Sequence, residues 1–168
     1  MHDEVILVDS QDREIGSCEK LKAHKEGFLH RAFSIFIFNS KNEMLLHQRA
    51  LGKYHSAGLW TNACCSHPRP GESLQNATAR RLQEELGISC PVTPIGTFIY
   101  RAKVEPDLIE HEFDHLFSGN YDGPLDRLNP EEVANVRWIA LPDLLQETKQ
   151  HPERFTAWFL LALPKIIS

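Results

Sequence analysis

A single predicted helix between two groups of short predicted strands restricts the possible folds of this chain more than any other feature. The helix covers about residues 72–86 and ends before Gly87, a residue suited to the left-handed position after a helix. Strand-like segments lie before it at residues 4–9, 13–18, 31–38, 43–48 and 59–65, and after it at residues 95–102, 109–117 and 136–139. One helix among many strands needs a sheet to cover its apolar face. With closing helices at residues 142–148 and 152–163, the pattern predicts an α/β (α+β) fold, a mixed β-sheet sandwich with an interior helix and flanking helices.

The length of 168 residues fits one domain, 1–168, with its core in about residues 4–160. The N-terminal segment lacks the basic and long apolar regions of a secretory signal. The most apolar segment, residues 155–163, is far shorter than the roughly 20 residues of a membrane-spanning helix. Four cysteines, two of them adjacent, suit reduced thiols better than a disulfide framework. We therefore expect a cytoplasmic protein without a membrane partner, either a monomer or a homodimer.

The charge of the chain is unevenly distributed. A formal net charge of -5 disfavours nucleic acid as a partner, because phosphate backbones are bound by an excess of Lys and Arg. Residues 47–81 nevertheless carry a charge of +4, and residues 82–168 carry -7. Such a chain could hold an anion on one side of a site and a cation on the other. From composition alone, a solvated surface with uneven charge is the simpler interpretation.

The predicted helix resembles the Nudix box, a strand, loop and helix motif that holds a divalent metal against a diphosphate. The matching residues are Glu72, Arg80, Arg81, Leu82, Glu84, Glu85, Gly87 and Ile88. Ser66 stands where the box has glycine, and Arg81 stands where it has glutamate. The resemblance implies a Nudix-like fold without one carboxylate that Nudix hydrolases use for diphosphate cleavage. Glu85 alone suits magnesium, although Arg81 and Glu85 at i, i+4 would also form an ordinary surface pair.

The segment before the helix has the sequence WTNACCSHPRPGES over residues 60–73. It is similar to the signature of the type 1 isopentenyl-diphosphate delta-isomerases, T-N-x-x-C-x-H-P followed by G-E-S. Further matches to this family lie at residues 19–24, 29–34, 48–53, 100–102, 110–112 and 155–158. The resemblance covers about residues 4–160, and the joint match of separated motifs is highly specific.

Glu110 and Glu112 alternate with His111 on a predicted strand, so both carboxylates share one face. Two buried like charges repel each other unless a cation or proton lies between them. The resemblance implies that His24, His30 and His67 join them to bind a transition metal, manganese or zinc, which imidazole and carboxylate ligands suit. For the other histidines a surface or packing role is the simpler interpretation: His2, His47, His55, His111, His115 and His151.

Cys64 and Cys65 are adjacent, and in an extended segment their side chains face opposite ways. The register of the signature selects Cys65 for the site and leaves Cys64 as a small buried residue. The same period of two places Cys65 and His67 on one face.

The resemblance implies a reversible 1,3-allylic rearrangement of isopentenyl diphosphate to dimethylallyl diphosphate. Cys65 and Glu112 would transfer protons on opposite faces of a carbocation-like intermediate. Tyr100 would be hydrogen-bonded to Glu112, and Trp158 would stabilise the cation with its indole face. Without the resemblance, a core role for Trp158 is the simpler interpretation.

The resemblance also implies that four cations bind the diphosphate: Lys20, Arg49, Lys53 and Arg81. Glu85 and the backbone carbonyl of Cys65 would hold a magnesium ion that bridges to the phosphates. Arg81 in place of glutamate favours binding a diphosphate over cleaving it. The alternatives are a Nudix-type diphosphate hydrolase and a non-catalytic isoprenoid- or nucleotide-binding module. The rest of the acidic excess is attributed to solubility, including Asp122, Asp126, Glu131 and Glu132.

Overall fold

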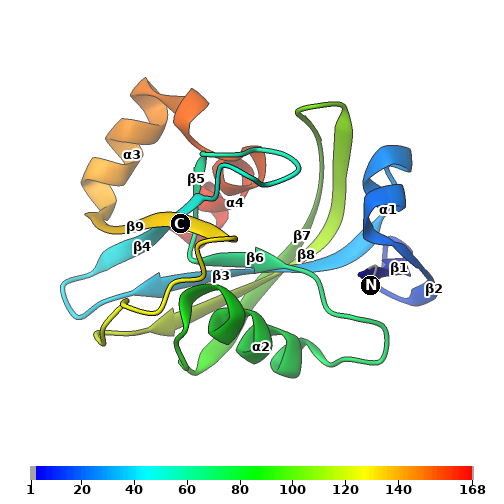
Figure 1. Ribbon diagram of the computed structural model, residues 1–168, viewed down its shortest axis with the longest axis horizontal. Helices are drawn as coiled ribbons and strands as arrows, with labels where there is room; N and C mark the ends of the chain where they lie inside the picture. The colour runs from blue at the N-terminus through cyan, green and yellow to red at the C-terminus, as the bar shows by residue number, and fades with distance from the viewer. Residues whose placement is uncertain (1–2, 168) are drawn as a thin grey trace.

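The structure is a computed structural model that describes residues 3–167, and its nine described strands form one mixed sheet (Figure 1). The strands are β1 (Glu4–Val8), β2 (Glu14–Glu19), β3 (His30–Phe38), β4 (Glu43–Arg49), β5 (Trp60–Thr61), β6 (Cys64–Ser66), β7 (Val92–Val104), β8 (Leu108–Asn120) and β9 (Val133–Ala140). The helices are α1 (Lys20–Glu26), α2 (Leu74–Leu86), α3 (Leu141–Gln150), η1 (Pro152–Arg154) and α4 (Ala157–Ile166). β3 and β8 pair in parallel, and the other strand pairs are antiparallel.

The centre of the sheet is buried on both faces. Successive side chains of a strand point to opposite faces, and β3 alternates accordingly: Phe33 and Ile35 pack in a core with Leu82 of α2. Phe36 instead packs in a second core with Phe159 of α4. Figure 1 shows α2 on one side of the sheet and α3 and α4 on the other. The predicted α+β fold, a mixed sheet with one helix between two groups of strands and further flanking helices, is therefore confirmed.

The helix predicted at residues 72–86 begins two residues later, because Ser73 is its N-cap. The Ser73 side chain accepts a hydrogen bond from the backbone N–H of Asn76 at 3.1 Å, which satisfies one of the free N–H groups of the first turn. The helix ends as predicted at Gly87, which adopts the left-handed conformation with φ of 67°.

The strand predicted at residues 59–65 is broken into β5 and β6. β5 pairs with β4, whereas β6 pairs with β3, so the chain crosses between two neighbours at residues 62–63. The side-chain amide of Asn62 donates hydrogen bonds to the backbone carbonyls of Ile35 at 2.8 Å and Cys64 at 3.1 Å. These bonds replace strand pairing at the crossing and fix the position of the cysteine pair.

Two other elements differ from the prediction. α1 was not predicted, because it is short and buries only Ala23 and His24 in place of a full apolar stripe. The last predicted helix, residues 152–163, is divided into η1 and α4, because Thr156 caps α4 by accepting from the N–H of Phe159 at 3.3 Å. Within residues 3–167, no helix has the length and apolar character needed to cross a membrane.

The close approach at Gly87 predicts a stability difference between two glycines. A Cβ at Gly87 would lie 2.5 Å from the carbonyl oxygen of Arg127, whereas a Cβ at Gly71, also in the left-handed region with φ of 81°, would meet nothing within 4 Å. We expect Gly71→Ala to cost about 1–2 kcal/mol through its backbone conformation alone. Gly87→Ala should cost about 3 kcal/mol or more, because overpacking is added. Urea unfolding of both variants measures the difference, and equal losses would contradict it.

Candidate active site

A cavity of about 600 Å³, including its part open to solvent, collects most of the predicted site residues from across the chain. The predicted residues that line it are Lys20, Arg49, Lys53, Cys65, His67, Arg81, Glu85, Tyr100, Glu110, Glu112 and Trp158. The remaining two, His24 and His30, are fully buried beside it. The structure therefore brings together residues that are up to 138 positions apart, from Lys20 to Trp158.

The predicted metal ligands form one compact group. One ligand atom from each of His24, His30, His67, Glu110 and Glu112 lies within 4.8 Å of the corresponding atoms of the others. The parallel register of β3 and β8 pairs His30 directly with Glu112. The alternation of β8 places both glutamates inward, while the intervening histidine contacts the backbone of Gly27 at the end of α1.

Hydrogen bonds at Nδ1 fix the ring orientation of two of these histidines, as is usual for histidines that bind metals. Nδ1 of His24 lies 2.7 Å from the carbonyl oxygen of Lys20, and Nδ1 of His30 lies 2.9 Å from that of Phe28. A carbonyl only accepts hydrogen bonds, so each Nδ1 carries the proton, and a neutral ring then presents an unprotonated Nε2. These Nε2 atoms lie 3.3 Å from Glu110 and 3.1 Å from Glu112. A lone pair facing a carboxylate is unfavourable unless a cation lies between them.

The electrostatics of the group also fit a divalent cation. Burial opposes ionisation of Glu110, yet the neighbouring imidazoles of His24 and His55 hold its pKa well below the usual range. Burial alone would lower the pKa of His24, but Glu110 raises it overall, so positive charge is favoured between these two groups. Burial lowers the pKa of His67 to about 4, which keeps that imidazole neutral and able to bind a metal. Nε2 of His24 and Oε2 of Glu110 are buried without a hydrogen-bond partner. The three nitrogens and two carboxylates therefore suit a divalent transition metal.

Cys65 is half-buried where it lines the cavity, and its thiol has polar neighbours. Its Sγ lies 2.9 Å from Oδ1 of Asn62 and accepts from the indole N–H of Trp158 at 3.1 Å. Because both N–H groups of Asn62 are used by backbone carbonyls, its oxygen must face the thiol. Burial raises the pKa of the Cys65 thiol to about 12, so it is protonated at neutral pH. Cys64 packs in the core on the other face, as the alternation predicted.

Tyr100 and Glu112 are paired across β7 and β8, and the Tyr100 hydroxyl donates to Oε1 of Glu112 at 2.5 Å. The other oxygen, Oε2, lies 2.7 Å from Nε2 of His67. Burial and the neighbouring Glu110 oppose ionisation of Glu112, but His67 and His30 lower its pKa overall. Glu112 thus contacts the histidines of the candidate metal group with Oε2 and the hydroxyl of Tyr100 with Oε1.

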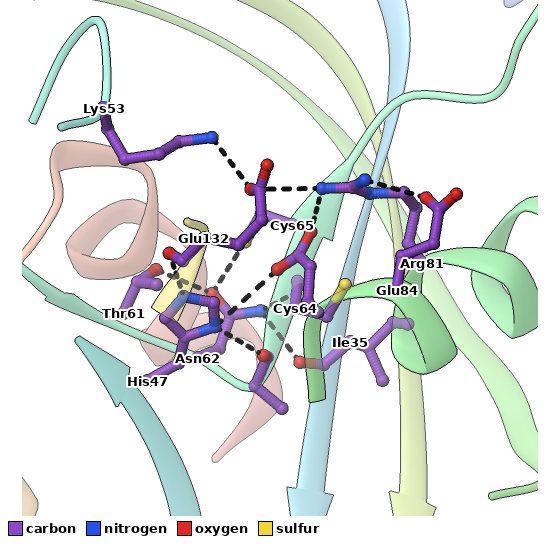
Figure 2. Close-up of polar contacts among 12 residues, drawn as sticks. Ile35, His47, Lys53, Thr61, Asn62, Cys64, Cys65, Arg81, Glu84 and Glu132 are labelled. Carbon is purple, nitrogen blue, oxygen red and sulfur yellow. Dashed lines mark hydrogen bonds and ion pairs between the residues drawn. The ribbon is translucent and has the colours of Figure 1, made fainter. Parts of the chain in front are cut away.

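The predicted cations line the cavity, and two of them contact Glu132, whose attribution to solubility was wrong. Figure 2 shows the Glu132 carboxylate between Lys53 and Arg81, and its Oε2 lies 2.9 Å from Nζ of Lys53 and 3.2 Å from Nη2 of Arg81. Arg81 also pairs with Glu85 at 2.6 Å. The predicted pair of Arg81 and Glu85 therefore exists. It is not an ordinary surface pair, because both residues line the cavity and Glu85 is buried. Burial and the nearby Lys53 lower the pKa of Lys20, so an added anion would relieve the crowding of cations.

Trp158 has cationic and aromatic neighbours in the cavity. The guanidinium of Arg49 lies over its ring, 5.2 Å from the centroid, and the ring of His55 meets it edge-on at 5.6 Å. The tryptophan therefore packs against one of the predicted diphosphate ligands.

His55 is a site residue that the sequence interpretation placed among surface or packing histidines. It is 4% exposed, lines the cavity, and has Nε2 at 2.8 Å from Oε1 of Glu110. His47 also lines the cavity but contacts the carbonyl of Ala63 at 3.0 Å, in keeping with a packing role. His2 lies outside the described residues. No spacing to Glu110 or Glu112 marks His55 in the sequence, because its place depends on the path of the loop between β4 and β5.

Comparison with known proteins agrees with this geometry. Residues 28–159 match the NUDIX domain family. The chain is 54% identical to the isopentenyl-diphosphate Delta-isomerase of Burkholderia multivorans, covering 95% of this chain and 90% of that protein. It is 53% identical to that of Serratia proteamaculans, covering 95% and 89%.

Two solved structures share the fold. DR0079 from Deinococcus radiodurans has a TM-score of 0.73 at 17% identity, covering 88% of this chain and 90% of that one. A MutT NUDIX hydrolase from Burkholderia pseudomallei has a TM-score of 0.63 at 20% identity, covering 81% and 96%. At these identities the likeness concerns the fold alone. The two close relatives, together with the NUDIX match over most of the chain, show that this protein belongs to the isopentenyl-diphosphate Delta-isomerase family.

Proposed function

We propose that this enzyme interconverts isopentenyl diphosphate and dimethylallyl diphosphate by adding a proton at one carbon and removing one at another. The alkene has no adjacent carbonyl to spread charge, so the reaction needs a proton donor and a proton acceptor held against one hydrocarbon chain. The relatives at 54% and 53% identity are named for the same activity.

The observation that carries the proposal is the pairing of Cys65 with Glu112 in one cavity. They come from different strands, β6 and β8, and both line the same space. The thiol has its pKa raised to about 12 and the carboxylate has its pKa lowered, so one group is protonated and the other ionised at neutral pH. One donor and one acceptor are what a proton shift in either direction requires. Tyr100 fixes Oε1 of Glu112 by hydrogen bonding.

The substrate diphosphate would bind to the cations that line the cavity. These are Lys20, Arg49, Lys53 and Arg81, and arginine offers paired donors that suit phosphate oxygens. Glu85 and the backbone carbonyl of Cys65 would hold a magnesium ion shared with the phosphates, as hard oxygen ligands do. Arg81 is paired with Glu85, Glu84 and Glu132, so it offers a cation where a Nudix hydrolase has a carboxylate.

The five-residue group would hold a manganese or zinc ion. When bound, that ion would supply the positive charge that allows Glu110 and Glu112 to stay ionised together in a buried place. Glu112 would then be held on one side by the metal group and on the other by Tyr100. This arrangement would fix the orientation of the Glu112 carboxylate in the cavity through both of its oxygens.

The expected compartment and partners follow from the same chemistry. All four cysteines are free, and a reaction that depends on the Cys65 thiol requires reducing conditions. The cytoplasm meets this requirement, and the partner is a small isoprenoid diphosphate.

The two proton-transfer residues are tested by substitution. We expect Cys65→Ala and Glu112→Gln each to reduce interconversion at least about a thousandfold, within the range of general acid–base contributions. The assay incubates the protein with isopentenyl diphosphate and magnesium in deuterated water and detects deuterium-labelled dimethylallyl diphosphate. Cys90→Ala, a partly buried cysteine outside the cavity, is the matched control and should keep full activity.

Each alternative function has its own outcome in that assay. A diphosphate hydrolase would release phosphate or a monophosphate, and a binding module would retain the ligand without product. Near-normal turnover by folded Cys65→Ala or Glu112→Gln would refute the assigned roles.

The raised pKa of Cys65 predicts a pH dependence of its alkylation. Only the thiolate reacts with iodoacetamide. With a pKa of about 12, the thiolate fraction of Cys65 is small at pH 7 and should rise about tenfold per pH unit up to pH 10 without levelling off. Mass spectrometry of the alkylated peptide follows the rate in the metal-free protein. A plateau near pH 8 would show an ordinary or lowered pKa instead.

Metal removal should lower both activity and stability. After chelation, the two buried glutamates lose their counter-ion, so we expect a lower melting temperature that manganese or zinc restores. An ion at 100 times its Kd adds about 2.7 kcal/mol. His24→Ala should lose this response, whereas His151→Ala, a partly exposed histidine outside the group and the cavity, should keep it. Complete restoration by magnesium alone would contradict a nitrogen-rich site.

A further inference from the structure

His55 lies next to the candidate metal group without belonging to it. The loop of residues 50–59, between β4 and β5, carries it into the cavity, where its side chain is 2% exposed. Its Nε2 lies 2.8 Å from Oε1 of Glu110, closer than Nε2 of His24, which lies 3.3 Å from the same oxygen. The nearest imidazole to this carboxylate is therefore one outside the five-residue group.

The hydrogen bonding of His55 favours one tautomer. Its Nδ1 lies 3.1 Å from Oγ of Ser56, a hydroxyl that can donate to it. Its Nε2 lies 2.8 Å from a carboxylate oxygen of Glu110, which only accepts hydrogen bonds. The geometry therefore places a proton on Nε2, which donates it to Glu110, while Nδ1 contacts the hydroxyl of Ser56.

This contact leaves two buried atoms available. Oε1 of Glu110 is occupied by His55, whereas Oε2 of Glu110 and Nε2 of His24 have no hydrogen-bond partner. Metal-binding carboxylates are commonly held in orientation by such an outer hydrogen bond. We propose that His55 is a positioning residue of the metal centre: it donates Nε2–H to Oε1 of Glu110 and so holds Oε2 in place for a divalent cation bound with His24.

The same residue joins the metal centre to the diphosphate-binding part of the cavity. Its backbone carbonyl accepts from Nη2 of Arg49 at 3.1 Å. Its ring meets Tyr54 edge-on at 4.4 Å, and Nζ of Lys20 lies 5.1 Å from the centre of the Tyr54 ring. Because the bond to Arg49 uses the main chain, a side-chain substitution at position 55 removes the contact with Glu110 and leaves that bond in place.

The test compares His55→Gln with His55→Met in metal-free protein. The two side chains are similar in length, but only glutamine can donate a hydrogen bond from the position of Nε2. The Kd for zinc is measured by competition with a chelating dye, and no isoprenoid substrate is needed. We expect His55→Met to weaken zinc binding about 10–100-fold, the usual effect of losing an outer hydrogen bond. His55→Gln should stay within about threefold of the unmodified protein.

His111→Ala is the control, because this histidine is adjacent to both glutamates in sequence but contacts the backbone of Gly27. The zinc affinity of the His111→Ala variant should equal that of the unmodified protein. Melting temperatures of the metal-free proteins show whether each variant folds, and the comparison of glutamine with methionine remains informative if both lose some stability.

Other outcomes would overturn the inference. Equal zinc affinity for folded His55→Met and the unmodified protein would show that the hydrogen bond has no positioning role. If His55→Gln and His55→Met weaken binding equally, and both change the visible absorption of the cobalt-substituted protein, His55 is a ligand itself. The inference rests on the proposed metal group, and the experiment distinguishes the two. Absence of zinc binding by the unmodified protein would refute the metal group. Zinc binding that is unchanged by substitution of His55 would refute only the role of His55.

Discussion

Two carboxylates buried side by side on β8 are the constraint on which the rest of the site depends. Glu110 and Glu112 are 4% and 6% exposed, and both have lowered pKa values despite burial. Like charges in such a place need compensation from several directions. The fold supplies this compensation with four histidines: one on α1, one at the start of β3, one just after β6 and one in the loop between β4 and β5. The parallel pairing of β3 with β8 is central, because it sets His30 directly beside Glu112.

The same scaffold supports different chemistry in its relatives. The likeness to a MutT NUDIX hydrolase, with a TM-score of 0.63 at 20% identity, concerns the arrangement of sheet and helices. In this chain α2 presents Arg81 to the cavity, paired with Glu85 and Glu132. A guanidinium at this place attracts a diphosphate but supplies no further carboxylate for a metal. A shared fold therefore does not by itself determine the reaction.

Local patterns predicted the parts of the site that depend on local geometry. The period of two on an extended chain separated Cys64 from Cys65 and placed Glu110 with Glu112, and the structure has both arrangements. The motif resemblance supplied the distant partners, which spacing alone does not reveal. Patterns failed where tertiary contacts determine the path of the chain. The strand predicted at residues 59–65 is broken, because Asn62 bonds the backbone where the chain changes neighbours.

His55 and Glu132 show why the remaining residues were missed. Each lies outside the regular elements that a periodic pattern can detect, and each is placed by a partner far away in sequence: Glu110 for His55, and Lys53 with Arg81 for Glu132. An acidic residue next to another in a polar segment is usually solvated. Here Lys53 and Arg81 lie on either side of Glu132, and this carboxylate offsets the repulsion between the two cations. Charge that looks like surplus in the composition therefore has a structural role here, because without the Glu132 carboxylate two cations that line one cavity would repel each other.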